Sequence, residues 1–334
     1  MKLQIAQAQQ LAHDVLVETG YTSENATRIA LHLLDSQLRG YVSAGLARIL
    51  AIRDRLGDKK PIEDISITAE TPVLAHLNGN DTFGYLVGEK AIEMVMAKAK
   101  ECGIAIVAAC NTWTTGMLAY YAEKAAKEDL VTIITANSTP WVTVEGGYKG
   151  INGTNPVCVG FPSSGKPLIL DIATSKILHA DIVLAQRLGT ELPANSAFNA
   201  QGEPTTDPFE VFQGSIAPWG GYKGSGLASM VQLFGVLAGS PAFPPPLERF
   251  GLSIIAIDPA RFRPISEYKT EVDKYCQGVK DSPVAEGAEA LRLPFERSAN
   301  VRAEALAAGE VDVDETVYKT LVKIVEGAIR DISQ

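Results

Sequence analysis

The sequence has fewer basic than acidic residues. Its 334 residues include 30 lysines and arginines against 39 aspartates and glutamates, which gives a formal net charge of −9 at pH 7. Binding to a nucleic-acid backbone depends on clustered lysine and arginine side chains that neutralise phosphates. The charge balance therefore argues against a nucleic-acid-binding protein.

The sequence also has no run of eighteen apolar residues, which is about the length that a transmembrane helix needs. Residues 1–20 lack the charged, apolar and small-residue segments of a secretory signal. Four scattered cysteines without C-x-x-C spacing are typical of a reducing compartment, where thiols pack as small apolar groups. We therefore expect a cytoplasmic protein that does not bind membranes.

Metal-binding and phosphate-binding motifs are missing as well. None of the four histidines stands at metal-ligand spacing from another histidine, a cysteine or a carboxylate, so no metal site is predicted. There is neither a G-x-S-x-G elbow nor a P-loop. The nearest match to a dinucleotide-binding turn begins at Gly224, but it follows a loop rather than a strand and lacks the third glycine. A Rossmann domain is therefore not expected.

Glycine and proline, in contrast, are plentiful. The 29 glycines and 18 prolines gather in short clusters between apolar runs, a pattern that predicts loops built around a ligand. Apolar periodicity and capping residues predict helices over residues 23–39, 46–56, 88–101, 117–127, 226–237, 266–281, 297–308 and 314–330, and one from Thr174 or Ser175 to Leu188. Strands are predicted within residues 64–77 and over 104–110, 131–136, 157–161, 168–173 and 252–258. We expect helix 226–237 to be buried on all sides, and residues 189–222 to form a long loop region.

The order of these elements predicts an α/β protein of about two domains. Helices at both ends of the chain flank a middle that is rich in strands and glycine. We therefore expect a discontinuous, helix-rich outer domain of residues 1–115 and 285–334, into which a central domain of residues 116–284 is inserted.

Five short motifs follow one another along the chain, namely Asn137-Ser138, Gly153-Thr154-Asn155-Pro156, Asp171-Ile-Ala-Thr-Ser175, Gly202-Glu-Pro-Thr-Thr-Asp-Pro208 and Gly220-Gly-Tyr-Lys-Gly224. Their order and spacing resemble those of the type-2 malate/lactate dehydrogenase family. The upstream segment 39–48 resembles the active-site helix of that family. The resemblance extends from about residue 5 to about residue 330.

This resemblance implies an oxidoreductase that uses NADPH or NADH bound to a non-Rossmann sheet domain. Family members reduce 2-oxo acids or cyclic imino acids and are mostly dimers, so the resemblance also implies a small carboxylate substrate and a homodimer. Arg48 would hold the substrate carboxylate, and Thr154 would contact the substrate. The cofactor residues that it implies are Thr114, Thr115, Gly116, Met117, Leu118, Asp171, Ile172, Ala173, Tyr222, Lys223, Gly224 and Arg297. We expect these segments to converge on one cleft between the domains, with Arg297 near its mouth.

The segment His179-Ala180-Asp181 resembles the His-Gly-Asp of the Δ1-piperideine-2-carboxylate and Δ1-pyrroline-2-carboxylate reductases within that family. In that branch, the aspartate orients an acid histidine that follows the motif serine. Ser43 and Asp181 are therefore the implied catalytic partners, but the histidine position is occupied by Ala44. Relatives also commonly carry histidine at the position of Thr114 and glycine at that of Phe295.

Each of these side chains also has an ordinary structural interpretation. Arg48 and Lys223 would serve equally well as surface charges. Asp181 would stabilise the first turn of a helix that begins near Ser175, and Thr154 would satisfy nearby backbone groups. We interpret His179 as a supporting residue rather than as a replacement acid.

The missing histidine leaves three hypotheses. Ketone reduction develops negative charge on oxygen and gains about 10²–10⁴ in rate from a general acid, whereas an iminium nitrogen arrives already protonated. The first hypothesis is therefore an NAD(P)H-dependent reductase of a cyclic 2-imino acid. The second is a 2-oxo acid or 2-hydroxy acid dehydrogenase with an altered or inactivated acid. The third is a catalytically inactive relative that binds cofactor, against which the joint presence of Ser43, Arg48, Thr154 and Asp181 argues.

Overall fold

The computed structural model describes residues 1–332. The two ends of the chain meet in a helical lobe, where β1 (Lys2–Gln4) pairs with β14 (Glu310–Asp312) in antiparallel fashion. This lobe contains α1 (Ile5–Glu18), α2 (Ser23–Leu38), α3 (Arg48–Leu56), α9 (Glu296–Ala308) and α10 (Glu315–Ile332). Its core is formed by side chains that recur at helical spacing, such as Ile29 and Leu33 of α2. Within the described residues, no helix combines the length and apolar character of a membrane span.

The largest sheet has seven strands, in the order β2-β3-β4-β13-β5-β8-β9. These are β2 (Ser66–Thr71), β3 (Leu74–Asn78), β4 (Ile104–Thr112), β13 (Phe250–Ile257), β5 (Val131–Ala136), β8 (Val157–Phe161) and β9 (Leu168–Ile172). Only the β3–β4 pair is parallel. The mixed α/β architecture confirms the predicted fold class.

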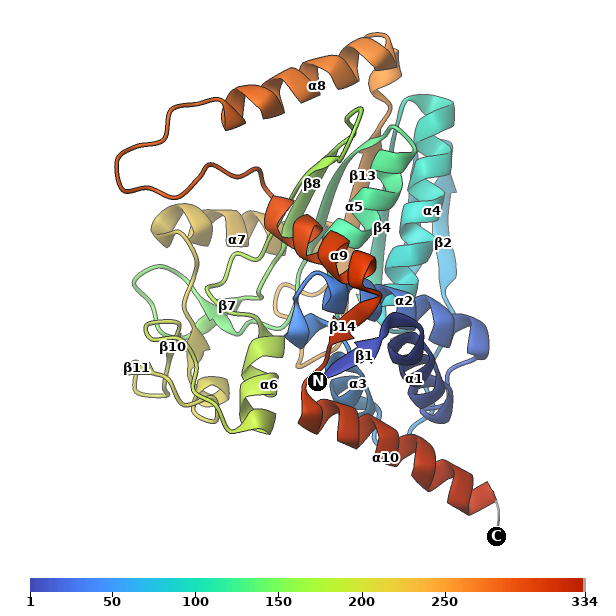
Figure 1. Cartoon of the computed structure of the whole chain (residues 1–334), viewed down its shortest axis with the longest axis vertical. Coiled ribbons are helices and arrows are strands. Elements are labelled where there is room, and N and C mark those ends of the chain that lie inside the picture. The colour runs from blue at the N-terminus through green and yellow to red at the C-terminus, as the bar shows by residue number, and fades with distance from the viewer. Residues whose placement is uncertain (333–334) are drawn as a thin grey trace.

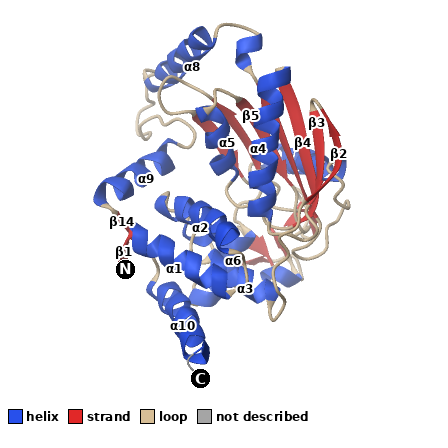
Figure 2. Cartoon of the chain, turned by 90° about the vertical axis from the view of Figure 1, so that its right-hand side faces the viewer, coloured by secondary structure: helices blue, strands red, loops and turns tan. Residues whose placement is uncertain are grey.

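Alternation along the strands explains how the two faces of this sheet are covered. Leu252, Ile254 and Ala256 of β13 point into a core shared with α4 (Gly84–Cys102) and α5 (Leu118–Lys127), which Figure 2 shows on one face. Ser253 points to the other face and lies against α7 (Gly221–Leu237).

This sheet crosses the expected domain boundary at residue 115. Strands β2 to β4 come from the first expected segment, yet β4 pairs along its length with β13 of the central one. The strand pairing therefore favours assigning residues 66–112 to the central domain. The helices of residues 1–56 and 296–332 remain as the outer lobe that we propose.

A second, smaller sheet has the order β11-β10-β12-β6-β7. Its strands are β6 (Val142–Thr143), β7 (Gly150–Asn152), β10 (Ala197–Phe198), β11 (Pro204–Thr205) and β12 (Ser215–Ile216). It shares a compact core with α6 (His179–Leu188). Residues 189–222, expected to be a long loop, thus contribute three strands. The remaining helix, α8 (Ile265–Lys280), lies at the opposite end of the molecule from α10 (Figure 1).

The predicted start of α6 is wrong. We expected Thr174 or Ser175 to cap it, but the helix begins at His179. The Thr174 hydroxyl instead donates to the carbonyl oxygens of Thr154 and Asn155, at 3.1 Å each. Ser175 forms a bridge with Pro218. These long-range contacts keep the segment out of the helix, because the Thr174 hydroxyl that would cap it is already bonded elsewhere.

The expectation that helix 226–237 is buried on all sides is also wrong. In α7, Ala228 and Val231 are buried, but Met230, Leu233 and Leu237 expose 54, 58 and 68% of their surface. One side of α7 packs on the sheet, and these three apolar side chains on the other side are more than half exposed. An apolar surface of this kind marks an interaction site in many proteins.

Candidate active site

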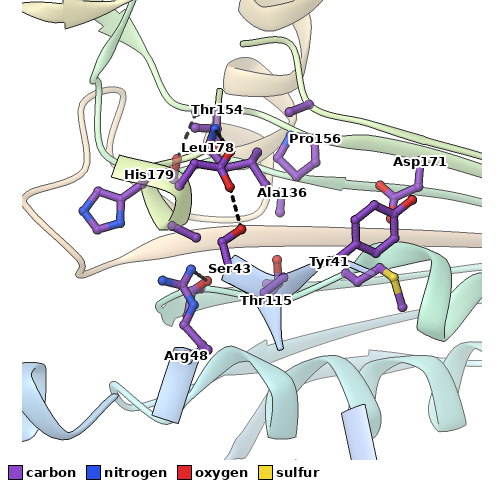
Figure 3. A pocket seen from close by; sticks show the side chains of 18 of the residues that line it. Tyr41, Ser43, Arg48, Thr115, Ala136, Thr154, Pro156, Asp171, Leu178 and His179 are labelled. Carbon is purple, nitrogen blue, oxygen red and sulfur yellow. Dashed lines mark hydrogen bonds between the residues drawn. The ribbon is translucent and has the colours of Figure 1, made fainter. Parts of the chain in front are cut away.

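A cavity of about 480 Å³ lies where the helical lobe, the large sheet and the small sheet meet. Its walls come from the segment around η1 (Val42–Ala44), the start of α3, the loops that follow β4 and β5, and the start of α6 (Figure 3). The predicted site residues among its lining are Ser43, Arg48, Thr114, Thr115, Gly116, Met117, Thr154, Asp171, Ala173 and Asp181. Segments more than a hundred residues apart in the chain therefore supply one cavity.

Buried Arg39 lies shortly before the η1 segment in the chain and anchors that part of the backbone. Its guanidinium binds Asp35 at 2.7 Å and Glu123 at 2.8 Å, and it lies 4.6 Å above the Phe295 ring. Phe295 adopts φ +65°, a backbone conformation that glycine adopts far more readily. The ring's contact with Arg39 offsets part of that conformational cost. This contact ties α9 to the turn that carries Ser43.

Ser43 and Asp181 come together across 138 residues of sequence. The Ser43 hydroxyl donates to Asp181 Oδ1 at 2.5 Å, and the backbone N–H of Leu178 donates to Asp181 Oδ2 at 2.8 Å. Asp181 therefore stabilises the first turn of α6 and orients Ser43 at the same time. The sequence suggested two roles for Asp181, in the first helical turn and as a partner of Ser43, and each role corresponds to one of these two hydrogen bonds. Ala44, next to Ser43, lines the cavity with a methyl group.

Arg48 is the first residue of α3 and reaches into the cavity. One guanidinium nitrogen, Nη2, donates to Thr114 Oγ1 at 3.0 Å, whereas Nε is buried without a hydrogen-bond partner. The Tyr85 hydroxyl is buried beside this guanidinium. A buried donor without a partner is costly, so Arg48 Nε is suited to a ligand that accepts hydrogen bonds. A carboxylate matches the planar fork of an arginine.

His179 and Trp141 stack face to face beside Arg48, with ring centroids 4.2 Å apart and an interplanar angle of 11°. Burial lowers the pKa of His179 to about 3, and the positive charge of Arg48 acts in the same direction. The imidazole is therefore neutral at pH 7. Of the described residues that line the cavity, only Arg48 carries a permanent positive charge.

Asp171 lies at the other end of the cavity, as Figure 3 shows. Its carboxylate accepts the backbone N–H of Ala119 at 2.8 Å, in the first turn of α5. Burial raises the pKa of Asp171 to about 6, although the hydrogen bonds from Ala119 and Leu118 oppose the shift. Figure 3 shows Tyr41 beside Asp171, with Pro156 and Ala136 in the wall towards the centre of the cavity.

The Thr114–Met117 segment follows β4 and is shaped by a buried histidine. His32 Nε2 accepts the backbone N–H of Met117 at 3.0 Å. Gly116 has φ +74°, and a Cβ there would come within 2.3 Å of Tyr85 and 2.7 Å of His32. Glycine is therefore required for the segment to pass this closely over His32.

Not all of the predicted cofactor residues line this cavity. Leu118 and Ile172 are sequence neighbours of lining residues but do not line it themselves. Tyr222, Lys223 and Gly224 lie in the first turn of α7 outside the lining, and Tyr222 is exposed. Arg297, on α9, lines a separate surface hollow together with Arg292 and Asn300. The structure thus brings two of the predicted segments together and leaves the α7 and α9 residues apart from them.

Several residues that line the cavity were not predicted from the sequence. They include Tyr41, Val42, Tyr85, Trp141, Leu178, Leu184, Leu247 and Phe250. Most are apolar or aromatic and have the pattern of ordinary core residues, so no local signal distinguishes them. Trp141 is the exception, because it directly follows the motif Asn137-Ser138 and a proline.

In the part of the chain that the structure describes, no three His, Cys, Asp or Glu side chains are grouped so that they could hold a metal ion. The polar groups that line the cavity include the Ser43–Asp181 pair, the Arg48 guanidinium and the Asp171 carboxyl.

Comparison with known proteins identifies the family to which these features belong. The model of a family described as malate/L-lactate dehydrogenase matches residues 3–322. The L-sulfolactate dehydrogenase of Methanocaldococcus jannaschii is 34% identical over 323 residues, which cover 93% of this chain and 92% of that protein. The Delta(1)-pyrroline-2-carboxylate reductase 2 of Burkholderia multivorans is 31% identical over 340 residues, 97% of each chain. The solved structure of sulfolactate dehydrogenase from Methanocaldococcus jannaschii has a TM-score of 0.83, covering 98% of this chain and 97% of that one at 32% identity.

Proposed function

Because the chain belongs to the malate/L-lactate dehydrogenase family and is an oxidoreductase, we propose that it reduces a cyclic 2-imino acid to the L-amino acid with NADPH or NADH. A substrate of the Δ1-pyrroline-2-carboxylate or Δ1-piperideine-2-carboxylate type fits this proposal. The observation that carries it is Ala44. A methyl group lines the cavity beside the Ser43–Asp181 pair, where the family resemblance implies an acid histidine.

The two substrate classes differ in their need for a proton. When the C2 atom of a 2-oxo acid accepts hydride, the carbonyl oxygen becomes an alkoxide and must take a proton, so a general acid is worth about 10²–10⁴ in rate. When the C2 atom of a protonated cyclic imine accepts hydride, the carbon–nitrogen double bond becomes single and the positive charge on nitrogen disappears. The product amine can then take its second proton from water. Ala44 is compatible with the second reaction.

The other titratable groups in the cavity do not replace the missing acid. His179 is neutral at pH 7 and lies at the Arg48 end, whereas the Asp171 carboxyl lies at the opposite end. The Ser43 hydroxyl already donates a hydrogen bond to Asp181. No residue in the place of the missing histidine therefore offers a strong acid to a ketone oxygen.

Arg48 would hold the substrate carboxylate through its fork of N–H groups. Its buried Nε has no partner, so a bound carboxylate would satisfy a donor that is otherwise costly. Thr154 lines the cavity, and its backbone N–H donates to Ser138 Oγ at 3.2 Å. In our proposal, the Thr154 side chain contacts the substrate ring.

The residues near Asp171 fit a nicotinamide ring. Ala136, Pro156, Met117 and Ala173 form apolar walls for a planar ring, and the Ser138 hydroxyl supplies a polar group for its carboxamide. When bound, the reduced cofactor supplies the hydride. The chain's own part is to orient the ring, exclude water and hold the substrate beside it. The residues of α7 and Arg297 would contact more distant parts of the cofactor.

Reduction of a 2-oxo acid is the second candidate. It is favoured by the relatives that are named sulfolactate, malate or lactate dehydrogenases, which match this chain as well as the imine reductases do. An inactive cofactor-binding relative is the third candidate. The orientation of Ser43 by Asp181 and the free donor on Arg48 argue against it, since a binder would need neither.

The test is the steady-state oxidation of NADPH and NADH with a panel of cyclic imines and 2-oxo acids. We expect kcat/KM for Δ1-pyrroline-2-carboxylate or Δ1-piperideine-2-carboxylate to exceed that for every 2-oxo acid by about 10²-fold or more. Turnover of 2-oxo acids without imine turnover would refute the proposal. A protein that quenches or enhances NADPH fluorescence on binding, but reduces neither class, would indicate the inactive relative.

We also infer a homodimer. The exposed apolar side of α7 supports it, because Met230, Leu233 and Leu237 form a surface that water solvates poorly. Light scattering on the purified protein should give twice the monomer mass. Leu233→Glu should then shift the protein towards the monomer mass, whereas Val301→Glu, at an exposed position on α9, should not.

A further inference from the structure

Aromatic side chains form one wall at the Arg48 end of the cavity. His179 stacks on Trp141, and the Phe212 ring lies 5.2 Å from His179 and 5.7 Å from Trp141. The three rings come from separate segments, namely the start of α6, the residue before β6, and η2 (Val211–Gln213). His179 and Trp141 line the cavity directly, whereas Phe212 supports them.

This wall is uncharged although it contains a histidine. Partial burial between two aromatic rings and the proximity of Arg48 keep the imidazole neutral. The carboxyls that line the cavity are Asp171 and Asp181, so the remaining fixed charges are negative. A substrate with one carboxylate would pair with Arg48. A second anionic group on that substrate would meet aromatic carbon and lose its hydration without gaining a cation.

We propose that the His179–Trp141 wall determines substrate specificity, accepting an uncharged ring or alkyl group on a substrate with one carboxylate and rejecting a second anionic group. This inference rests on the proposed function only in placing the substrate carboxylate at Arg48. Sulfolactate and malate, to which the names of some relatives refer, each carry two anionic groups, so the inference predicts that this chain rejects both compounds. Specificity then comes from an unfavourable contact with the wrong substrate as well as from a favourable one with the right substrate.

The unmodified protein gives the first test. In calorimetric titrations with the oxidised cofactor present, L-lactate should bind at least about 10²-fold more tightly than L-malate. In turnover assays, pyruvate should be preferred over oxaloacetate and 3-sulfopyruvate by a similar factor. Equal binding or equal turnover of the monoanion and the dianion would overturn the inference, whichever substrate class proves to be natural.

A single substitution gives the second test. His179→Arg adds a cation to the wall and should raise the oxaloacetate-to-pyruvate ratio of kcat/KM by about 10-fold or more, because a charge-assisted hydrogen bond becomes possible. His179→Phe keeps a stacked ring without charge, so the preference against dianions should persist even if absolute rates change. Thr190→Arg is the matched control, since it adds the same charge at an exposed position just beyond α6.

The outcomes distinguish this inference from the proposed function. A shift of the ratio in His179→Arg alone supports the wall, even if no cyclic imine is reduced. Imine reduction without any shift in His179→Arg would support the proposed function and overturn this inference. An equal shift in Thr190→Arg would also overturn it, because the effect would then come from overall charge. If His179→Arg fails to fold, the comparison of L-lactate with L-malate on the unmodified protein decides.

Discussion

Replacing Ala44 by histidine would restore an imidazole beside a pair of groups that are already in place. Ser43 donates to Asp181 Oδ1 at 2.5 Å, and Asp181 is itself fixed by the backbone N–H of Leu178. A histidine at position 44 would therefore have an ordered carboxylate nearby to fix its tautomer. An added imidazole would lie beside Ser43, where our proposal places the substrate ring, so it would crowd a ring more than a small 2-oxo acid.

The expected gain can be bounded from the structure. A positioned general acid is worth about 10²–10⁴ in the rate of ketone reduction. The imidazole must be protonated to act, and each unit by which its pKa lies below the assay pH costs about tenfold in the protonated fraction. Burial and Arg48 lower the pKa of nearby His179, whereas Asp181 would raise the pKa of a histidine at position 44. The gain should therefore be largest near pH 6 and smaller at pH 8.

The assay measures kcat/KM from pH 6 to pH 8 for the unmodified protein and for Ala44→His. The substrates are pyruvate, Δ1-pyrroline-2-carboxylate and Δ1-piperideine-2-carboxylate. Under our proposal, Ala44→His leaves imine turnover unchanged or lowers it through crowding. Ala44→Leu is the control, because it fills similar space without offering a proton. Adding Asp181→Asn to Ala44→His should remove most of any gain on pyruvate, since the imidazole would lose its orienting carboxylate.

Two results would refute the reasoning. A gain of 10²-fold or more on pyruvate, with no imine turnover by either variant, would identify the protein as a disabled 2-oxo acid reductase. A gain on pyruvate in Ala44→Leu equal to that in Ala44→His would show that shape, rather than a proton, is what position 44 controls.

Three further predictions follow from single contacts. Arg48→Ala should lower kcat/KM by about 10²–10³, mainly through KM, while fluorescence titration shows unchanged NADPH affinity; equal losses of both would contradict its assignment to the carboxylate. Asp171 has a folded pKa of about 6, above its ordinary value of 3.8, so its contribution to stability is present below pH 4 and lost as the pH rises through 6. In urea unfolding, the stability of Asp171→Asn relative to the unmodified protein should therefore rise by about 2 kcal/mol between pH 4 and pH 8, and a constant difference would contradict the shift. At Phe295, Ala should destabilise by about 1 kcal/mol more than Gly, because both lose the contact with Arg39 but only Gly relieves the strain at φ +65°; a thermal melt that ranks them the other way would contradict that strain.

The sequence alone determined most of the secondary structure and much of the site. Strands β5 and β8 begin and end at the predicted residues, because runs of β-branched and apolar residues between turn signals leave few alternatives. The predicted helix 23–39 begins where α2 begins, directly after the cap at Thr22. The predicted helix 88–101 ends within one residue of α4, which stops before Gly103, since capping depends on chemistry within one turn. The motifs likewise identified the Ser43–Asp181 pair and Arg48 as candidates before their distances were known.

The tertiary structure alone decided where α6 begins, which faces are covered and which aromatic side chains line the Arg48 end of the cavity. Thr174 has the chemistry of a helix cap, but its hydroxyl bonds to the loop of Thr154 twenty residues earlier, so α6 starts later. The even apolar pattern of α7 does not reveal that only one side meets the sheet. Trp141 and His179 are 38 positions apart, and nothing local in either segment indicates that they stack. Periodicity and capping record contacts within a few residues, whereas these features depend on partners that only the folded chain brings within reach.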